Sequence, residues 1–284
     1  MLGAYPNKMT STEKVTSGSD SEGCNANPRL QPSKTPSSFA SRAWQHLKAP
    51  VRPSGFAEFE LTLLTFCTGL QDAISFPDYH CFTSNQTGNT VFLMLAIALP
   101  HLDGEMFITA NIGTALGLFL AAGWVTGQLS HIIGPRRRIW LMLCNFVQAC
   151  LVLAAAAIQH THGVQLTGAW TLAVLGLLAF ASGSQVVQSR SLQMTEISTA
   201  MATAAWVDLV IDPHLFTLKN RPRTRRIAFL ASLVLGALVG AFIYKTAGSA
   251  AAIAVSGAGK LLVAFMYLFN SAEQERPDSA EDSV

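Results

Sequence analysis

Long hydrophobic runs separated by short polar segments fill most of the chain, and their lengths predict the architecture. A helix needs about 20 predominantly apolar residues to cross a hydrocarbon core of ~30 Å. Five runs meet this length or nearly so, and a sixth is weaker because Glu60, Gln71 and Asp72 interrupt it. The pattern predicts an all-α integral membrane protein with six transmembrane helices, at residues 58–76, 106–129, 139–158, 169–188, 227–244 and 248–269.

Two further segments have helical character but are poor candidates for spanning. Residues 88–99 are apolar but too short, and residues 195–211 are too polar for lipid. Charge placement decides between the possible topologies, because Lys and Arg concentrate in cytoplasmic loops. Three basic clusters share one face only if neither short helix crosses, which also makes both termini cytoplasmic. These clusters are Arg42 with Lys48 and Arg52, residues 136–138, and Lys219 with Arg221, Arg223, Arg225 and Arg226.

The order of elements indicates an internal repeat. Gly69-Leu70-Gln71 ends one helix and Gly183-Ser184-Gln185 ends another 114 residues later, and each is followed by an irregular stretch, a short helix and a Gly-rich span. A unit with three crossings ends on the opposite side of the membrane from its start, so the second copy enters from that opposite side. The halves, about 58–159 and 167–269, therefore form an inverted 3+3 repeat. Inverted repeats with interrupted helices recur in transporters, although GxxxG spacing by itself only lets helices pack closely.

Composition supports this organisation. Half of the residues are hydrophobic, 13% are charged and the mean hydropathy is +0.34, against about a quarter charged in soluble domains. We expect a disordered polar tail over residues 1–55, a membrane domain over 56–271 and an acidic tail over 272–284. The sequence has no basic patch interleaved with aromatic residues, so we expect no nucleic-acid partner. The expected partners are the lipid bilayer and a small polar solute. The five cysteines lack metal-ligand spacing.

A polar stripe on the first predicted span is the first candidate for chemistry. Thr65, Thr68, Asp72 and Ser75 recur at helical spacing, with Gln71 beside them. A carboxylate in hydrocarbon is costly and by default suggests function. The alternative is that Asp72 lies near the helix end and caps backbone groups. Gln71, Asp72 and Ser75 are therefore candidate substrate-binding residues.

The start of the first short helix is the second candidate. Thr87, Gly88, Asn89 and Thr90 follow Asn85-Gln86, and a helix N-terminus attracts anions and carbonyl groups. We expect these four residues to line a small polar site; the alternative is a helix cap without a ligand.

These stretches carry a resemblance to a known family. The run GLQDAISF…NQTGNTVFL, with Phe76 and Phe82 around it, resembles the YoaK-like family of bacterial and fungal membrane proteins of unknown function, over about residues 58–269. The resemblance implies a multi-pass membrane protein and supplies no substrate or catalytic residue. The second half departs from the family, with Thr199-Ala200 where another Thr-Gly pair often stands.

Lys260 is the last candidate, because it lies within the otherwise uncharged run 247–269. A central ammonium group must pair, snorkel or lose its proton. We predict that Lys260 faces the bundle interior beside a carboxylate, Asp72 first and Asp208 second, and joins the substrate-binding set.

No catalytic, metal or cofactor motif accompanies these residues: Ser256–Lys260 lacks the spacing of a phosphate loop, and GxSxG and HExxH are missing. We therefore expect a transporter-like protein for a small polar or anionic solute and not an enzyme. The alternative is a membrane scaffold or assembly protein, and an intramembrane enzyme ranks third.

Overall fold

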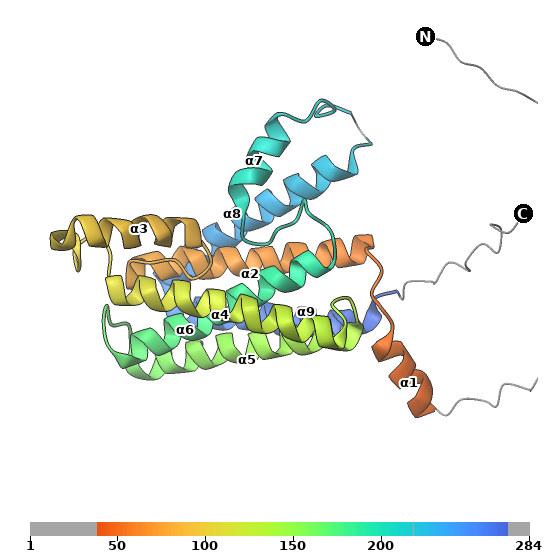
Figure 1. Ribbon diagram of the computed structural model, residues 1–284, viewed down its shortest axis with the longest axis horizontal. Helices are drawn as coiled ribbons and strands as arrows, with labels where there is room; N and C mark the ends of the chain where they lie inside the picture. The colour runs from red at the N-terminus through yellow and green to blue at the C-terminus, as the bar shows by residue number, and fades with distance from the viewer. Residues whose placement is uncertain (1–38, 218, 272–284) are drawn as a thin grey trace, which may run out of the picture. The chain divides into compact units, whose positions relative to one another are not determined.

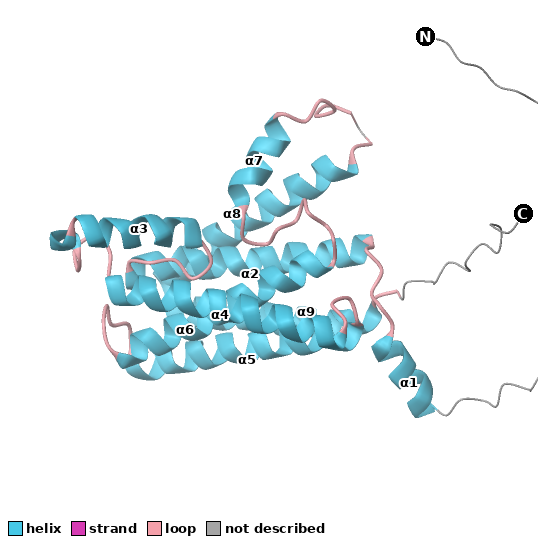
Figure 2. Ribbon diagram, viewed as in Figure 1, coloured by secondary structure: helices cyan, strands magenta, loops and turns pink. Residues whose placement is uncertain are grey.

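The computed structural model describes residues 39–217 and 219–271, which form helices and no β-strand (Figures 1 and 2). The long helices are α2 (Gly55–Tyr79), α4 (Thr109–Ile133), α5 (Arg138–His162), α6 (Ala169–Ser191), α8 (Arg221–Ala247) and α9 (Ser249–Met266). The shorter helices are α1 (Phe39–Lys48), α3 (Gln86–Ala98), α7 (Ala202–Val210), and the 3₁₀ turns η1 (Pro100–Leu102) and η2 (Tyr267–Phe269).

Within the described residues, five helices are long and apolar enough to cross a membrane: α4, α5, α6, α8, and α9 continued through η2. A multi-pass membrane protein is therefore supported. Helix α2 is equally long, at 25 residues, but it is less apolar because it carries Glu58, Glu60, Asp72 and Asp78.

The long helices pack in three principal pairs, and the contacts fix their directions. α2 and α8 run parallel, since Glu58 contacts Arg225 and Leu70 contacts Gly240. α4 and α6 also run parallel, since Leu118 contacts Gly176 and Ala122 contacts Gly183. α5 and α9 run antiparallel, with Gln148 beside Lys260 and Gln159 beside Ser249.

Glycine permits the closest approaches of these pairs. A Cβ on Gly69 would lie 2.4 Å from the carbonyl oxygen of Leu233, and one on Gly183 would lie 2.3 Å from that of Phe119. By contrast, a Cβ on Gly113 or Gly117 of α4 would meet no atom within 4 Å. The close contact of α4 with α6 therefore depends on the glycine of α6, and the Gly113/Gly117 spacing does not mark it.

The core consists of two apolar clusters separated by a polar layer. One cluster gathers around Ile74, Ile112 and Leu178, and the other around Leu61, Leu141 and Phe229. Between them lies a buried polar set of Thr68, Gln71, Gln148, Ser182, Gln185, Ser256 and Lys260.

The basic cluster at 136–138 is not simply a solvated topology signal. Arg138 is completely buried and donates to the carbonyl oxygens of His46, Tyr267 (3.0 Å) and Asn270 (2.5 Å). Glu60, also buried, accepts from the Asn270 amide at 2.7 and 2.8 Å. Arg138 therefore ties α1 and the end of α9 to α5.

The elements differ from the sequence predictions at two places. Residues 39–48, expected to be disordered, form α1, which Arg138 holds through His46; residues 1–38 and 272–284 of the expected tails lie outside the described residues. The second short helix is confined to Ala202–Val210. It starts late because Ser198 bonds the backbone of Met201 and Thr199 takes a left-handed φ of 59°.

Candidate functional site

The irregular segment between α2 and α3 is held by one buried side chain. Asn89 accepts from the backbone N–H of Phe82 at 2.9 Å and donates to the Phe82 carbonyl at 2.6 Å. It also donates to Gln86 at 2.9 Å. Asn89 therefore closes the segment onto the first turn of α3 and is fully buried in doing so.

Asp72 fixes the same segment from the side of α2. Its two carboxylate oxygens accept from Ser84, one from the backbone N–H at 3.3 Å and one from the hydroxyl at 2.5 Å. The segment just before α3 is thereby bound to the C-terminal half of α2. The capping alternative for Asp72 is thus correct in part, because the carboxylate binds a backbone amide.

A cavity of about 920 Å³ lies where α3 and α7 begin. Asp72, Ser84 and the first residues of α3 line one side, and Arg190 with the first residues of α7 lines the other. Figure 1 shows that α3 and α7 each start near the middle of the long helices and run away from it. Phe119 and Leu233, from α4 and α8, complete the apolar lining.

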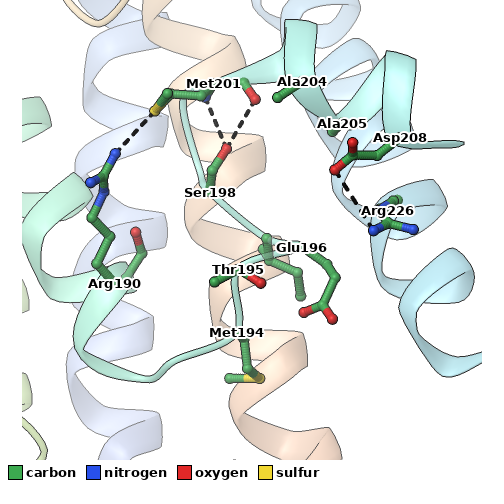
Figure 3. A pocket seen from close by; sticks show the side chains of 12 residues that line it. Arg190, Met194, Thr195, Glu196, Ser198, Met201, Ala204, Ala205, Asp208 and Arg226 are labelled. Carbon is green, nitrogen blue, oxygen red and sulfur yellow. Dashed lines mark hydrogen bonds and ion pairs between the residues drawn. The ribbon is translucent and has the colours of Figure 1, made fainter.

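A smaller cavity of about 220 Å³ adjoins it beneath the segment that leads to α7 (Figure 3). Arg190, Met201, Ala204 and Asp208 line both cavities. In Figure 3, Arg190 reaches toward the Met201 sulfur, while Asp208 on α7 reaches toward Arg226 on α8.

Arg226 is engaged by two carboxylates, Asp208 at 3.7 Å and Asp212 at 3.4 Å. The backbone N–H of His214, with smaller contributions from Asn220 and Arg226, holds the pKa of Asp212 below its usual range. These contacts attach α7 to α8.

The predicted site residues divide into two groups. Asp72, Thr87 and Gly88 line the larger cavity. Those that do not line it are Gln71, Ser75, Asn89, Thr90 and Lys260. Ser75 is buried and donates to the Asp72 carbonyl, and the exposed Thr90 donates to the carbonyl of Gln86.

Gln71 and Lys260 belong instead to the buried polar layer. Gln71 donates to Ser256 at 2.7 Å and accepts from Ser182 at 3.4 Å. Lys260 is completely buried, as predicted, but its ammonium group donates to the side-chain oxygens of Gln148 (3.4 Å) and Gln185. The predicted carboxylate partner is wrong, because Asp72 binds Ser84 and Asp208 pairs with Arg226.

Arg190 is the cavity residue that sequence reasoning missed. It follows directly after the 169–188 run and resembles an ordinary charge at a helix end. The sequence does carry one signal for Arg190, because residues 169–195 contain no Asp or Glu that could pair with it. No group of three or more His, Cys, Asp or Glu side chains that could hold a metal ion occurs within 39–217 and 219–271.

Comparison with known proteins yields one match. A family model described as "Protein of unknown function (DUF1275)" matches residues 61–266. No curated protein and no solved structure matches the chain.

Proposed function

The chain belongs to the DUF1275 family of proteins of unknown function, and from its site we propose that it is a transporter-like protein for a small polar or anionic solute. The observation that carries the proposal is the 920 Å³ cavity between the starts of α3 and α7. Binding sites formed by interrupted helices at the interface of two repeats are the recurring design of secondary transporters. Membership in the YoaK-like group is part of the proposal, on the Gln86–Asn89 motif.

The directions of the helices support six crossings. α2 lies antiparallel to α6, because Thr68 contacts Gln185 and Gln71 contacts Ser182. α4 is parallel to α6 and therefore antiparallel to α2, so the chain starts α4 on the side where α2 ended. The same argument applies to α6 and α8.

The lengths of the short helices agree with this topology. At 1.5 Å per residue, α3 extends about 20 Å and α7 about 14 Å, against a core of ~30 Å. Neither is long enough to cross. We therefore propose α2 as the sixth span, with both termini on the cytoplasmic side.

Equivalent contacts support the inverted repeat. Gly69 approaches Leu233 closely, and Gly183 approaches Phe119 closely. Gly69 and Gly183 lie 114 positions apart, and so do Phe119 and Leu233.

The polar layer repeats the correspondence. Ser182 of α6 donates to Gln71 of α2, and Gln185 of α6 donates to Thr68 of α2 at 2.9 Å. Thr68 corresponds to Ser182, and Gln71 to Gln185, at the same offset of 114 positions, so each half contributes the same two positions to this contact. The cavity is lined by such partners as well: Asp72 with Val186, and Phe119 with Leu233. A cavity on the axis between two halves is where alternating access requires the site.

The scaffold alternative rests on the polar layer. Gln71, Lys260 and their partners satisfy one another inside the bundle, which is what a protein without a ligand requires. The cavity at Asp72 favours transport, since both short helices contribute polar side chains to its lining, Thr87 from α3 and Thr203 with Asp208 from α7.

Solute uptake into phosphatidylcholine vesicles tests the proposal. The panel comprises radiolabelled phosphate, sulfate, succinate, glutamate and glucose. We expect protein-dependent uptake of at least one solute, with Asp72→Asn and Thr87→Val each lowering the initial rate about tenfold, or ~1.4 kcal/mol. Asp72→Asn weakens the Ser84 contact that positions the segment before α3, and Thr87→Val removes a hydroxyl from the cavity. Thr90→Val, one turn along α3 and outside the cavity, should match wild type.

Two results would count against this proposal. Uptake no faster than in protein-free vesicles for every solute supports the scaffold alternative. Uptake that is equally fast in all variants removes Asp72 and Thr87 from the site.

A further inference from the structure

The charges that line the larger cavity are unequally engaged. Asp72, Arg190 and Asp208 are its three charged residues. Asp72 accepts two hydrogen bonds from Ser84, and Asp208 lies 3.7 Å from the Arg226 guanidinium. Both carboxylates are therefore already paired within the protein.

Arg190 has no comparable partner. Its side chain donates a hydrogen bond from Nη2 to the Met201 sulfur at 3.3 Å (Figure 3), and no carboxylate of residues 39–217 or 219–271 lies within ion-pair distance. A thioether is a weak acceptor, while a guanidinium carries five N–H donors. The side chain is exposed and lines both cavities, so most of its donors are available to a bound molecule.

Two threonines, each in the first turn of a short helix, supply further donors. Thr87 is the second residue of α3 and Thr203 the second residue of α7, and both line the larger cavity. Neither hydroxyl has a hydrogen-bond partner among the described residues. The cavity therefore presents one guanidinium and two hydroxyls beside two carboxylates that other residues already bind, Asp72 through Ser84 and Asp208 through Arg226.

We infer that Arg190 is the anion-binding residue of this cavity and that the solute carries an oxyanion, a carboxylate, phosphate or sulfate group. A planar guanidinium donates two parallel hydrogen bonds to a pair of oxygens on such a group, which a lone ammonium does not. The inference rests on the proposed function and names the solute class. It also makes Arg190, in place of Lys260, the basic residue of the predicted substrate-binding set, since the Lys260 ammonium donates to Gln148 and Gln185.

Equilibrium binding in phosphatidylcholine nanodiscs tests the inference. Inorganic phosphate, sulfate and succinate are titrated against the full chain at constant ionic strength, with chloride as the reference. We expect at least one of the three to bind and Arg190→Gln to weaken it about tenfold or more. The exposed Arg137 lies outside the cavity, and Arg137→Gln should change affinity less than about twofold.

A second arm separates a free anion from a lipid headgroup. Phosphatidylglycerol added to the nanodiscs displaces the soluble anion if a headgroup occupies the cavity, and leaves its affinity unchanged if the occupant comes from water. Both results support an oxyanion site at Arg190.

Three results would overturn the inference: equal affinity in Arg190→Gln and wild type, equal losses in Arg190→Gln and Arg137→Gln, or binding of none of the three anions. Its failure is distinguishable from failure of the proposed function. Uptake that is insensitive to Arg190→Gln defeats the inference alone, whereas Arg190-dependent binding without uptake defeats transport alone.

Discussion

Replacing Arg138 with methionine is expected to lower stability by about 3–5 kcal/mol, the typical cost of removing one partner from a buried charge network. The substitution leaves the carbonyl oxygens of His46, Tyr267 and Asn270 without their donor. It also removes the positive charge that attracts the buried Glu60. We expect a loss of at least about 6 °C in the melting temperature of the detergent-solubilised protein.

The neighbouring arginine provides the control. Arg137 is exposed, and Arg137→Met should shift the melting temperature by less than about 2 °C. Arg138→Lys keeps the charge but loses the planar fork of donors, so it should fall between the two. Equal melting temperatures for Arg138→Met and Arg137→Met would show that the buried hydrogen bonds do not hold this end of the bundle.

Adding one methyl group at Gly69 or Gly183 is the second large effect that we expect. The new Cβ would lie 2.4 or 2.3 Å from a backbone carbonyl oxygen, so each substitution must push a helix pair apart. Overpacking of this kind costs about 1–3 kcal/mol. Because the two contacts correspond, Gly69→Ala and Gly183→Ala should destabilise the protein by similar amounts, which thermal unfolding in detergent measures.

Gly117→Ala is the matched control for both substitutions. Its Cβ meets open space on α4, and alanine is a better helix former than glycine by about 1 kcal/mol. We therefore expect an unchanged or slightly higher melting temperature. A fall as large as that of Gly183→Ala would indicate that the α4 face is also closely packed, and a loss at only one of Gly69 and Gly183 would contradict their equivalence.

The helical elements could largely be predicted from the sequence, because hydrophobic runs report directly on spans. The 139–158 and 169–188 runs, for example, lie within α5 and α6. The start of α7 could not be predicted, since the left-handed Thr199 and the Ser198 cap are local choices that hydropathy does not record.

The site was predictable only in part. The burial of Lys260 followed from its apolar surroundings, but its partners come from α5 and α6, and uncharged glutamines such as Gln148 carry no signal for pairing. Asn89 was predicted to line the site, but it does not line the cavity, and its contacts close the α2–α3 segment. Arg190 could not be recognised as a site residue from the sequence, because only the folded chain brings α7 and Arg190 to the same cavity.

In the arrangement that we propose, the two halves are inverted, so the segments after α3 and α7 face opposite sides of the membrane. This arrangement is tested most directly with single cysteines at Glu105 and Phe216, both exposed, in the full chain with its own cysteines replaced. An impermeant thiol reagent is applied to sealed membranes before and after permeabilisation. The inverted arrangement predicts that one position is labelled before permeabilisation and the other only afterwards. Labelling of both from the same side would mean that α7 crosses the membrane between α6 and α8, and would contradict the inverted arrangement.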